Sequence, residues 1–236
     1  MSIEQLAIPL SVDQKASFDN FWSGNHQELI ASFKAAVEHG QPSLVYCYGP
    51  EASGKSHLLY AAMRLASELK VNTSYLALTD PCINADMLSL VDLASVVCVD
   101  DISAWAGDND KERALFSLFE QIKANDGCLL ITASNAPLEQ GFIIPDLASR
   151  LASGLIYPLH QLNEEQQGFV LKLRAKHKGL NIGDDVVKYL CQRTTRDTAK
   201  LILLLEELDH AALVAKRRIT IPFVKQFLNS NKQSKT

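Results

Sequence analysis

Long apolar runs are missing from this 236-residue sequence. Its apolar stretches SLVYCY and LASVVCV are far shorter than the roughly 18 residues that a membrane-spanning helix needs. The first twenty residues also lack the basic and then apolar pattern of a secretory signal. These absences predict a cytoplasmic protein with no membrane partner.

Paired cysteines and an excess of positive charge are also absent. No C-x-x-C pair occurs, which argues against zinc-ribbon and disulfide frameworks and predicts five buried free thiols. The 23 lysine and arginine residues are outnumbered by 27 aspartate and glutamate residues, so the net charge is −4. Without an overall positive field, we expect any nucleic-acid role to be local or indirect. The cysteines are Cys47, Cys82, Cys98, Cys128 and Cys191.

What the sequence does contain is an alternation of strand and helix patterns. The β-branched or apolar runs SLVYCY, TSYLAL, SVVCV, CLLITAS and LIYPL are separated by segments with helical spacing, which is typical of a parallel sheet covered by helices. After Leu159 only helical patterns follow, and Asn163 with Gln166 predicts a capping box where they begin. The predicted divisions are a tail at 1–12, an α/β domain at 13–160, a helical domain at 161–230 and a polar tail at 231–236.

One segment carries a phosphate-binding motif. GPEASGKS, residues 49–56, matches G-x-x-x-x-G-K-[ST] and lies between a predicted strand and a predicted helix. In such a loop, backbone N–H groups surround phosphate oxygens and the helix presents its positive end to them. We expect Lys55 to reach the β- and γ-phosphates and the Ser56 hydroxyl to coordinate Mg²⁺. The residues predicted to contact the nucleotide here are Pro50, Glu51, Ala52, Ser53, Gly54, Lys55, Ser56 and His57.

Two further predicted strands end in polar residues. LASVVCVDD ends in Asp100 and Asp101, and the carboxyl ends of parallel strands face the ligand crevice. We expect Asp100 to hold Mg²⁺ through water and Asp101 to orient an attacking water, the alternative being two solvated acids in a turn. CLLITASN places Ser134 and Asn135 where a polar side chain could sense the γ-phosphate.

The order of these motifs, with PDLASRL at 145–151 and TTRDTAKL at 194–201, resembles that of the AAA+ ATPases. It is most similar to the DnaA family of bacterial replication initiators, over about residues 12–230. SFDNF resembles the family's adenine-pocket segment, and GKSHLLYA and VDDISAWAG resemble its phosphate and magnesium motifs. The resemblance implies a P-loop parallel sheet with helices on both faces, a small C-terminal helical lid, and an adenine nucleotide, ADP or ATP, with Mg²⁺.

The resemblance also implies roles for individual residues. Arg150 matches the arginine finger that acts in trans on a neighbour's nucleotide, the alternative being a surface or lid-anchoring arginine. Arg196 matches the lid arginine that contacts phosphate, the alternative being a salt bridge at a helix start. An aromatic segment would meet the base and ribose, although such aromatics are also common in cores; its residues are Phe18, Asp19, Asn20 and Phe21.

The layout, a short tail before the core and no helix-turn-helix domain after the lid, resembles family members that work with the replication sliding clamp. QLAIPL resembles clamp-binding peptides of the form Q-L-x-[LI]-[PF]. In such a peptide Gln5 would enter a polar pocket, and an apolar groove would take Leu6, Ile8 and Pro9. The implied partners are the initiator DnaA and the sliding clamp, with DNA reached mainly through the clamp and the replisome placing the protein at the nucleoid.

Two departures from the family pattern predict weak intrinsic hydrolysis. Ser134 and Asn135 stand where the initiators carry aspartate and arginine, and Asp101 is shorter than the glutamate of vigorous AAA+ motors. We therefore expect a negative regulator that stimulates hydrolysis of initiator-bound ATP. Two alternatives stay open: a stand-alone ATPase or helicase-loader-like protein using Asp101 and Arg150 in a homo-oligomer, and a small-molecule kinase.

Overall fold

The computed structural model describes residues 16–233 apart from 25, 42, 90, 92–94 and 194–196. The chain divides into two compact units between His160 and Gln161, each with its own hydrophobic core. Within the described part, no helix is long and apolar enough to cross a membrane. Some predicted functional residues lie outside the described residues, so their roles stay predictions: Gln5, Leu6, Ile8, Pro9 and Arg196.

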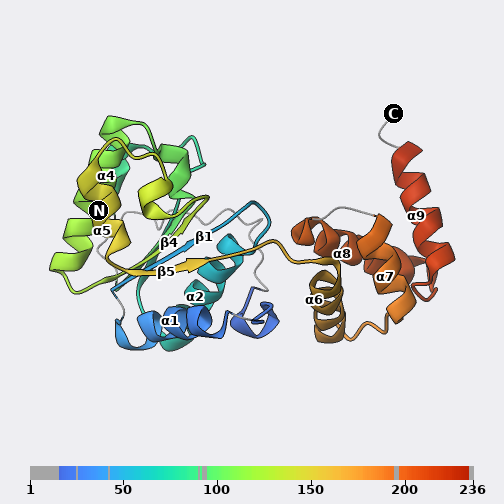
Figure 1. Cartoon of the computed structure of the whole chain (residues 1–236). Coiled ribbons are helices and arrows are strands. Elements are labelled where there is room, and N and C mark those ends of the chain that lie inside the picture. Colours follow the sequence, from blue (N-terminus) through green and yellow to red (C-terminus); the bar gives the residue numbers. More distant parts are fainter. Residues whose placement is uncertain are drawn as a thin grey trace. The chain divides into compact units, whose positions relative to one another are not determined.

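The first unit is built on a five-stranded parallel sheet with the strand order β2-β3-β4-β1-β5. Figure 1 labels three of these strands, β4, β1 and β5. The five predicted strands are confirmed, because β-branched and apolar residues recur where the sheet is covered on both faces. β3 and β4 are buried along their whole length. The strands are β1 (Leu44–Tyr48), β2 (Thr73–Ala77), β3 (Val96–Asp100), β4 (Cys128–Ala133) and β5 (Leu155–Pro158).

Helices cover both faces of this sheet, as the AAA+ resemblance predicts. α1 (Gln27–His39) and α2 (Lys55–Leu69) pack on one face. α4 (Asn109–Ala124) and α5 (Pro145–Ala152) pack on the other, as Figure 1 shows. The shorter elements are α3 (Ala85–Leu88) and the 3₁₀ turns η1 (Phe18–Asn20), η2 (Ile102–Trp105) and η3 (Pro137–Glu139).

The strand register brings three chain segments to one edge of the sheet. Tyr48 at the end of β1 is paired with Ala133 at the end of β4, and Val99 of β3 is paired with Ile131 of β4. Because all of these strands run in the same direction, the loops that follow them leave from the same edge. The residues after β1, β3 and β4 therefore lie at a common site.

The second unit is all-helical in its described residues, so the prediction of helical patterns alone after Leu159 is confirmed for them. Leucine and valine residues at helical spacing form its core. The predicted capping box is also confirmed: Asn163 N donates to Gln166 Oε1 and Gln166 N donates to Asn163 Oδ1, each at 2.9 Å. The helices are α6 (Glu164–His177), α7 (Asp184–Arg193), α8 (Thr198–Ala215) and α9 (Ile221–Gln233).

The prediction that every cysteine is buried is wrong for two of the five. Cys47, Cys98 and Cys128 are buried in the sheet, whereas Cys191 is half-buried and Cys82 is exposed. Cys82 lies in the turn between β2 and α3, where its N–H donates to Asp80 Oδ1 at 2.9 Å, and surface turns carry no burial requirement. All five thiols are free, as predicted.

Candidate nucleotide-binding site

The loop of residues 49–56 needs its two glycines for steric reasons. A Cβ on Gly49 would lie 2.2 Å from the Leu159 carbonyl oxygen, which is too close for any side chain. Gly54 has a φ of 96°, and a Cβ there would lie 2.8 Å from Cε2 of Phe21. Glycine at both positions therefore permits a compact turn between β1 and α2.

The first turn of α2 contains no acidic residue, so no carboxylate of that turn neutralises the positive end of the helix dipole. The Lys55 ammonium donates to the backbone oxygens of Gly49 and Pro50, at 2.7 and 2.8 Å, so it lies across its own loop. Ser53 is buried, and its Oγ has no hydrogen-bond partner among the described residues. An unpaired hydroxyl, a cation and a helix N-terminus are together suited to an anion site.

Asp100, at the end of β3, lies in a hydrogen-bond network between strands. It is 8% exposed, and its two carboxylate oxygens accept bonds from the Tyr75 hydroxyl, at 2.8 Å, and from the Thr132 hydroxyl. Tyr75 is in turn 2.9 Å from the Tyr60 hydroxyl. Burial, and next the charge of Asp100, raise the pKa of Tyr75, so this phenol stays protonated and remains a donor.

The next residue, Asp101, has a strained backbone. Its φ of 54° and ψ of 64° lie in the left-handed region, which costs a non-glycine residue about 1–3 kcal/mol. A bond of 2.8 Å from its N–H to Thr132 Oγ1 helps to hold this conformation. Its Oδ1 is buried without a hydrogen-bond partner in the described structure, so this carboxylate can still accept a bond from a water or ligand.

Ser134 and Asn135 follow β4 and complete this edge of the sheet. Their backbones are fixed, since Ser134 N donates to Ser103 Oγ at 2.7 Å and Asn135 N donates to Gln140 Oε1 at 3.1 Å. The Asn135 carbonyl also accepts from the Tyr46 hydroxyl at 2.9 Å. Both residues are exposed, so their side chains are accessible next to the loop of residues 49–56.

The predicted aromatic segment divides into a core residue and a site residue. Phe18 is 9% exposed and packs in the core, with the Lys34 ammonium 5.5 Å from its ring centroid. Phe21 is half-buried beside Gly54, and its ring centroid is 5.7 Å from that of His57. Asp19 is exposed, and Asn20 is buried, where it caps the turn by accepting from Ser17 N.

His26 and His160 also lie in this region, and the sequence patterns indicated neither of them. The His26 ring centroid is 6.4 Å from that of Phe21. Burial, and next the proximity of His160, lower the pKa of His26 and favour its neutral form. No motif pointed to either residue, because their proximity depends on how the segment before α1 folds back on the end of β5.

Arg150 is held on α5, away from the loop. Its Nε lies 3.4 Å from Glu120 Oε1 of α4, and the two side chains are 47% and 43% exposed. Among the described residues, no hydrogen bond or ion pair joins Arg150 to residues 49–56. Its exposure leaves the guanidinium accessible to a second molecule.

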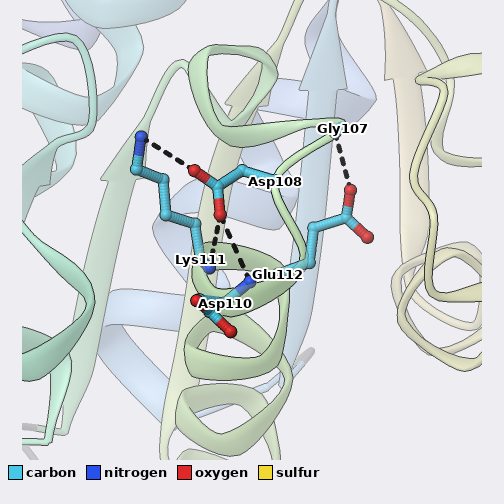
Figure 2. A network of polar contacts seen from close by, with 5 residues as sticks. All are labelled: Gly107, Asp108, Asp110, Lys111 and Glu112. Atoms are coloured by element: carbon cyan, nitrogen blue, oxygen red, sulfur yellow. Dashed lines mark hydrogen bonds and ion pairs between the residues drawn. The ribbon is translucent and has the colours of Figure 1, made fainter.

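The helix that carries Arg150 is anchored by a buried acid, Glu112. Glu112 is completely buried and accepts bonds from the N–H groups of Gly107 (2.7 Å), Ile143 (3.0 Å) and Ile144 (2.8 Å). Figure 2 shows the bond to Gly107 beside the α4 cap, where Asp108 accepts from backbone amides of α4 and pairs with Lys111. Ile144 directly precedes α5, so Glu112 fixes the point at which α5 begins.

The donor set of the site suits magnesium better than zinc. No cluster of three or more histidine, cysteine or acidic side chains able to hold a metal occurs in the described part of the chain. Mg²⁺ needs no such cluster, because it commonly binds one or two protein oxygens, several waters and the substrate phosphates. The Ser56 hydroxyl and the Asp100 carboxylate fit this pattern.

Residues 164–228 match the family described as Hda, lid domain. The chain is similar to domain III of the Thermotoga maritima replication initiation protein DnaA, with a TM-score of 0.76 and 17% identity over 94% of this chain and 98% of that one. AMPPCP-bound DnaA from Aquifex aeolicus gives a TM-score of 0.66 and 20% identity over 83% of this chain and 66% of that one.

A further similar structure is the RuvB Holliday junction branch migration motor of Thermotoga maritima, with a TM-score of 0.69 and 20% identity over 92% of this chain and 72% of that one. At these identities the structural matches establish the fold. The match to the Hda lid domain is separate from them and concerns only residues 164–228. The chain therefore has the AAA+ fold of these proteins, and its residues 164–228 match the Hda lid domain, in agreement with the predicted resemblance.

Proposed function

We propose that this protein is a nucleotide-bound regulator of replication initiation that stimulates hydrolysis of the ATP held by the initiator DnaA. The observation that carries the proposal is the match of residues 164–228 to the Hda lid domain, in a chain whose fold is that of DnaA domain III. The finer steps rest on the residues of the first unit.

The nucleotide is an adenine nucleotide bound at residues 49–56. The unpaired Ser53 hydroxyl, the acid-free start of α2 and the Lys55 ammonium support phosphate binding, with Lys55 exchanging its loop carbonyls for phosphate oxygens. Phe21 and His57 flank the loop and would contact the base. Mg²⁺ bound by Ser56, and through water by Asp100, would neutralise phosphate charge.

Hydrolysis by this chain alone is slow. Both oxygens of Asp100 already accept protein hydrogen bonds, and the side chains of Ser134 and Asn135 carry no charge to place near the γ-phosphate. A retained diphosphate would then stabilise the fold, because a ligand that binds only the folded state raises its stability.

Arg150 acts on a nucleotide held by the partner. Its exposed guanidinium has no bond to its own phosphate loop, and a surface ion pair such as that with Glu120 is weak enough to exchange. An arginine placed on a transferring phosphoryl group stabilises the charge of the transition state, an effect of about 10³–10⁵ in rate. The finger assignment follows from this exposure together with the sequence motif.

The segment QLAIPL tethers the protein to the sliding clamp. Gln5, Leu6, Ile8 and Pro9 supply the polar and apolar groups that a clamp-binding peptide uses. A tether raises the effective concentration of Arg150 wherever clamps are loaded on DNA. Initiator inactivation would therefore follow ongoing replication.

The test is a partner-dependence assay of initiator ATP hydrolysis. We expect accelerated hydrolysis only when this protein, DnaA, the clamp and DNA are all present. Replacing Gln5 and Leu6 by alanine should remove the acceleration together with clamp pull-down, while nucleotide binding persists. An unchanged lifetime of DnaA-bound ATP in the complete mixture would show that the proposal is wrong.

A second candidate function, a stand-alone ATPase, is favoured by one observation. The strained Asp101 has a buried carboxylate oxygen with no hydrogen-bond partner in the described structure, as a water-positioning acid would have. The two functions differ in what the purified protein does by itself. Sustained ATP turnover without any partner, lost in Asp101→Asn, would favour the stand-alone ATPase.

A further inference from the structure

The charge of this protein is divided unevenly between its two units. Residues 1–160 contain nine lysines and arginines against nineteen aspartates and glutamates, whereas residues 161–236 contain fourteen against eight. Although the net charge of the whole chain is negative, the helical unit therefore has a net charge of +6. Such asymmetry is typical of proteins in which one part contacts a polyanion.

The most concentrated part of this charge is a short segment between α8 and α9. Lys216, Arg217 and Arg218 follow one another and are all exposed. We call these three residues the basic turn. The described structure contains no ion pair to any of them, and the first turn of α9, which comes next, has no acidic residue. Their charges are therefore not neutralised by any described residue of the unit.

Three other cations of the unit are different in this respect, because each forms an ion pair. Lys172 pairs with Asp184 at 2.7 Å, and Lys178 pairs with Glu206 at 2.9 Å. On α8, Lys200 pairs with Asp197, the residue that caps that helix. The unit thus neutralises several of its cations internally. At the basic turn, by contrast, positive charge remains available to bind another molecule.

The basic turn is also held in place on both sides. Arg217 N donates to the Ala212 carbonyl at 3.0 Å, which closes the end of α8. Ile219, directly after the turn, is buried in the core of the unit. The three long side chains therefore project from an anchored backbone, so less conformational entropy is lost when a ligand binds them.

We propose that the basic turn binds the phosphate backbone of duplex DNA directly. This contact goes beyond the proposed function, in which DNA is reached through the clamp, and does not depend on it. Regularly spaced phosphates suit consecutive lysine and arginine side chains. Exposed charges are screened over about 8 Å at physiological ionic strength, so the local cluster determines the contact despite the net charge of −4.

A membrane surface fits the basic turn less well than DNA does. An interfacial helix needs a broad apolar face for lipid, but the main apolar face of α8 is already buried in the core through Leu201, Leu205 and Leu208. Leu213 and Val214 are exposed beside the basic turn, and two residues are too few for such a face. They can instead lie against deoxyribose.

The test uses the full-length protein and a short fluorescein-labelled DNA duplex in an anisotropy titration over a range of salt concentrations. We expect a dissociation constant on the order of 10⁻⁴–10⁻⁶ M that weakens steeply with salt. Replacing Lys216, Arg217 and Arg218 together by alanine should weaken binding at least about tenfold. It should also lower the salt slope by about two to three, since each phosphate contact contributes about 0.9.

A control variant with the same net charge separates location from total charge. Arg64, Lys70 and Lys123 are exposed cations of the first unit, and their joint replacement by alanine should leave DNA binding nearly unchanged. Circular dichroism and melting temperatures show whether the basic turn serves only to complement the C-terminal end of α8. A triple variant that melts earlier but binds DNA normally would support that structural role and overturn the proposal.

Other outcomes also decide against DNA. Failure of the wild-type protein to bind the duplex overturns the proposal, as does equal weakening in both triple variants. Binding to phosphatidylglycerol vesicles in place of DNA, lost with the basic turn, would assign the surface to lipid headgroups. Self-association lost in the same variant, without DNA binding, would assign it to the acidic unit of a second copy.

Discussion

The Nε of Arg150 lies 3.4 Å from Oε1 of Glu120, and both side chains are about half exposed. Exposed ion pairs of this kind contribute about 0.2–1 kcal/mol. Glu120 therefore orients the guanidinium of Arg150, and breaking this ion pair costs little free energy. A phosphate of higher charge can replace the carboxylate when a partner docks.

We predict that Arg150→Ala abolishes stimulated hydrolysis of initiator-bound ATP, a loss of about 10³ or more, while nucleotide and clamp binding stay intact. Glu120→Gln should keep the stimulation and change the free energy of unfolding by less than about 1 kcal/mol. Arg113, an exposed arginine of α4 bonded to Asn109, supplies the control as Arg113→Ala. Stimulation that survives in Arg150→Ala would exclude the finger.

Tyr75 is predicted to stabilise the fold through Asp100. Tyr75→Phe removes a bond to a buried carboxylate, and we expect it to lower the free energy of unfolding by about 1.5–3 kcal/mol. Tyr60→Phe removes only the bond between the two phenols and should cost about 1 kcal/mol or less. Urea unfolding followed by tryptophan fluorescence measures both, since Trp22 and Trp105 both belong to the first unit. Equal costs would contradict the network.

The lowered pKa of His26 predicts a pH dependence of stability. Because burial and His160 lower its pKa in the folded state, the unfolded chain binds a proton more readily. The stability of the first unit should therefore fall as the pH drops below the ordinary value of 6.5, and this contribution should level off below the folded-state pKa. Unfolding by urea at a series of pH values measures the slope. His26→Asn should reduce it, and replacement of the exposed His210 in the second unit should not.

The sequence predicted the elements whose patterns are local. Five apolar runs gave the strands, and leucine spacing with the capping box at Asn163 gave the lid helices. The candidate phosphate-binding loop was equally local, since its two glycines, lysine and serine lie within eight consecutive residues. Patterns of this kind can be recognised without knowing what packs against them.

The remaining features depend on contacts between distant segments. Thr132 and Tyr75 became partners of Asp100 through the strand register, which no single run of residues records. Phe18 and Phe21 are the same residue type and lie three positions apart in one segment, yet the fold places one in the core and the other beside Gly54. Cys82 is exposed because of the turn in which it lies, a fact that composition alone could not supply.

Glu112 is far from Arg150 in sequence, yet its contacts affect how the helix that carries this candidate finger is positioned. Its buried carboxylate holds three backbone N–H groups, including that of Ile144 at the start of α5. Glu112→Gln places an amide donor among these N–H groups, and we expect a loss of about 1–3 kcal/mol in unfolding free energy. The start of α5 should also loosen, so that stimulation by Arg150 falls although its own side chain is unchanged.

Hydrogen exchange distinguishes this anchoring from a simple charge effect. In Glu112→Gln, the amides of Gly107, Ile143 and Ile144 should exchange faster than in the wild-type protein, because each loses strength in its bond to the carboxylate. Asp110→Asn removes the same charge from the same helix end, but Asp110 is exposed, so only a few tenths of a kcal/mol should be lost. If both variants exchange alike, Glu112 acts through the charge at the start of α4, and α5 owes its position to packing alone.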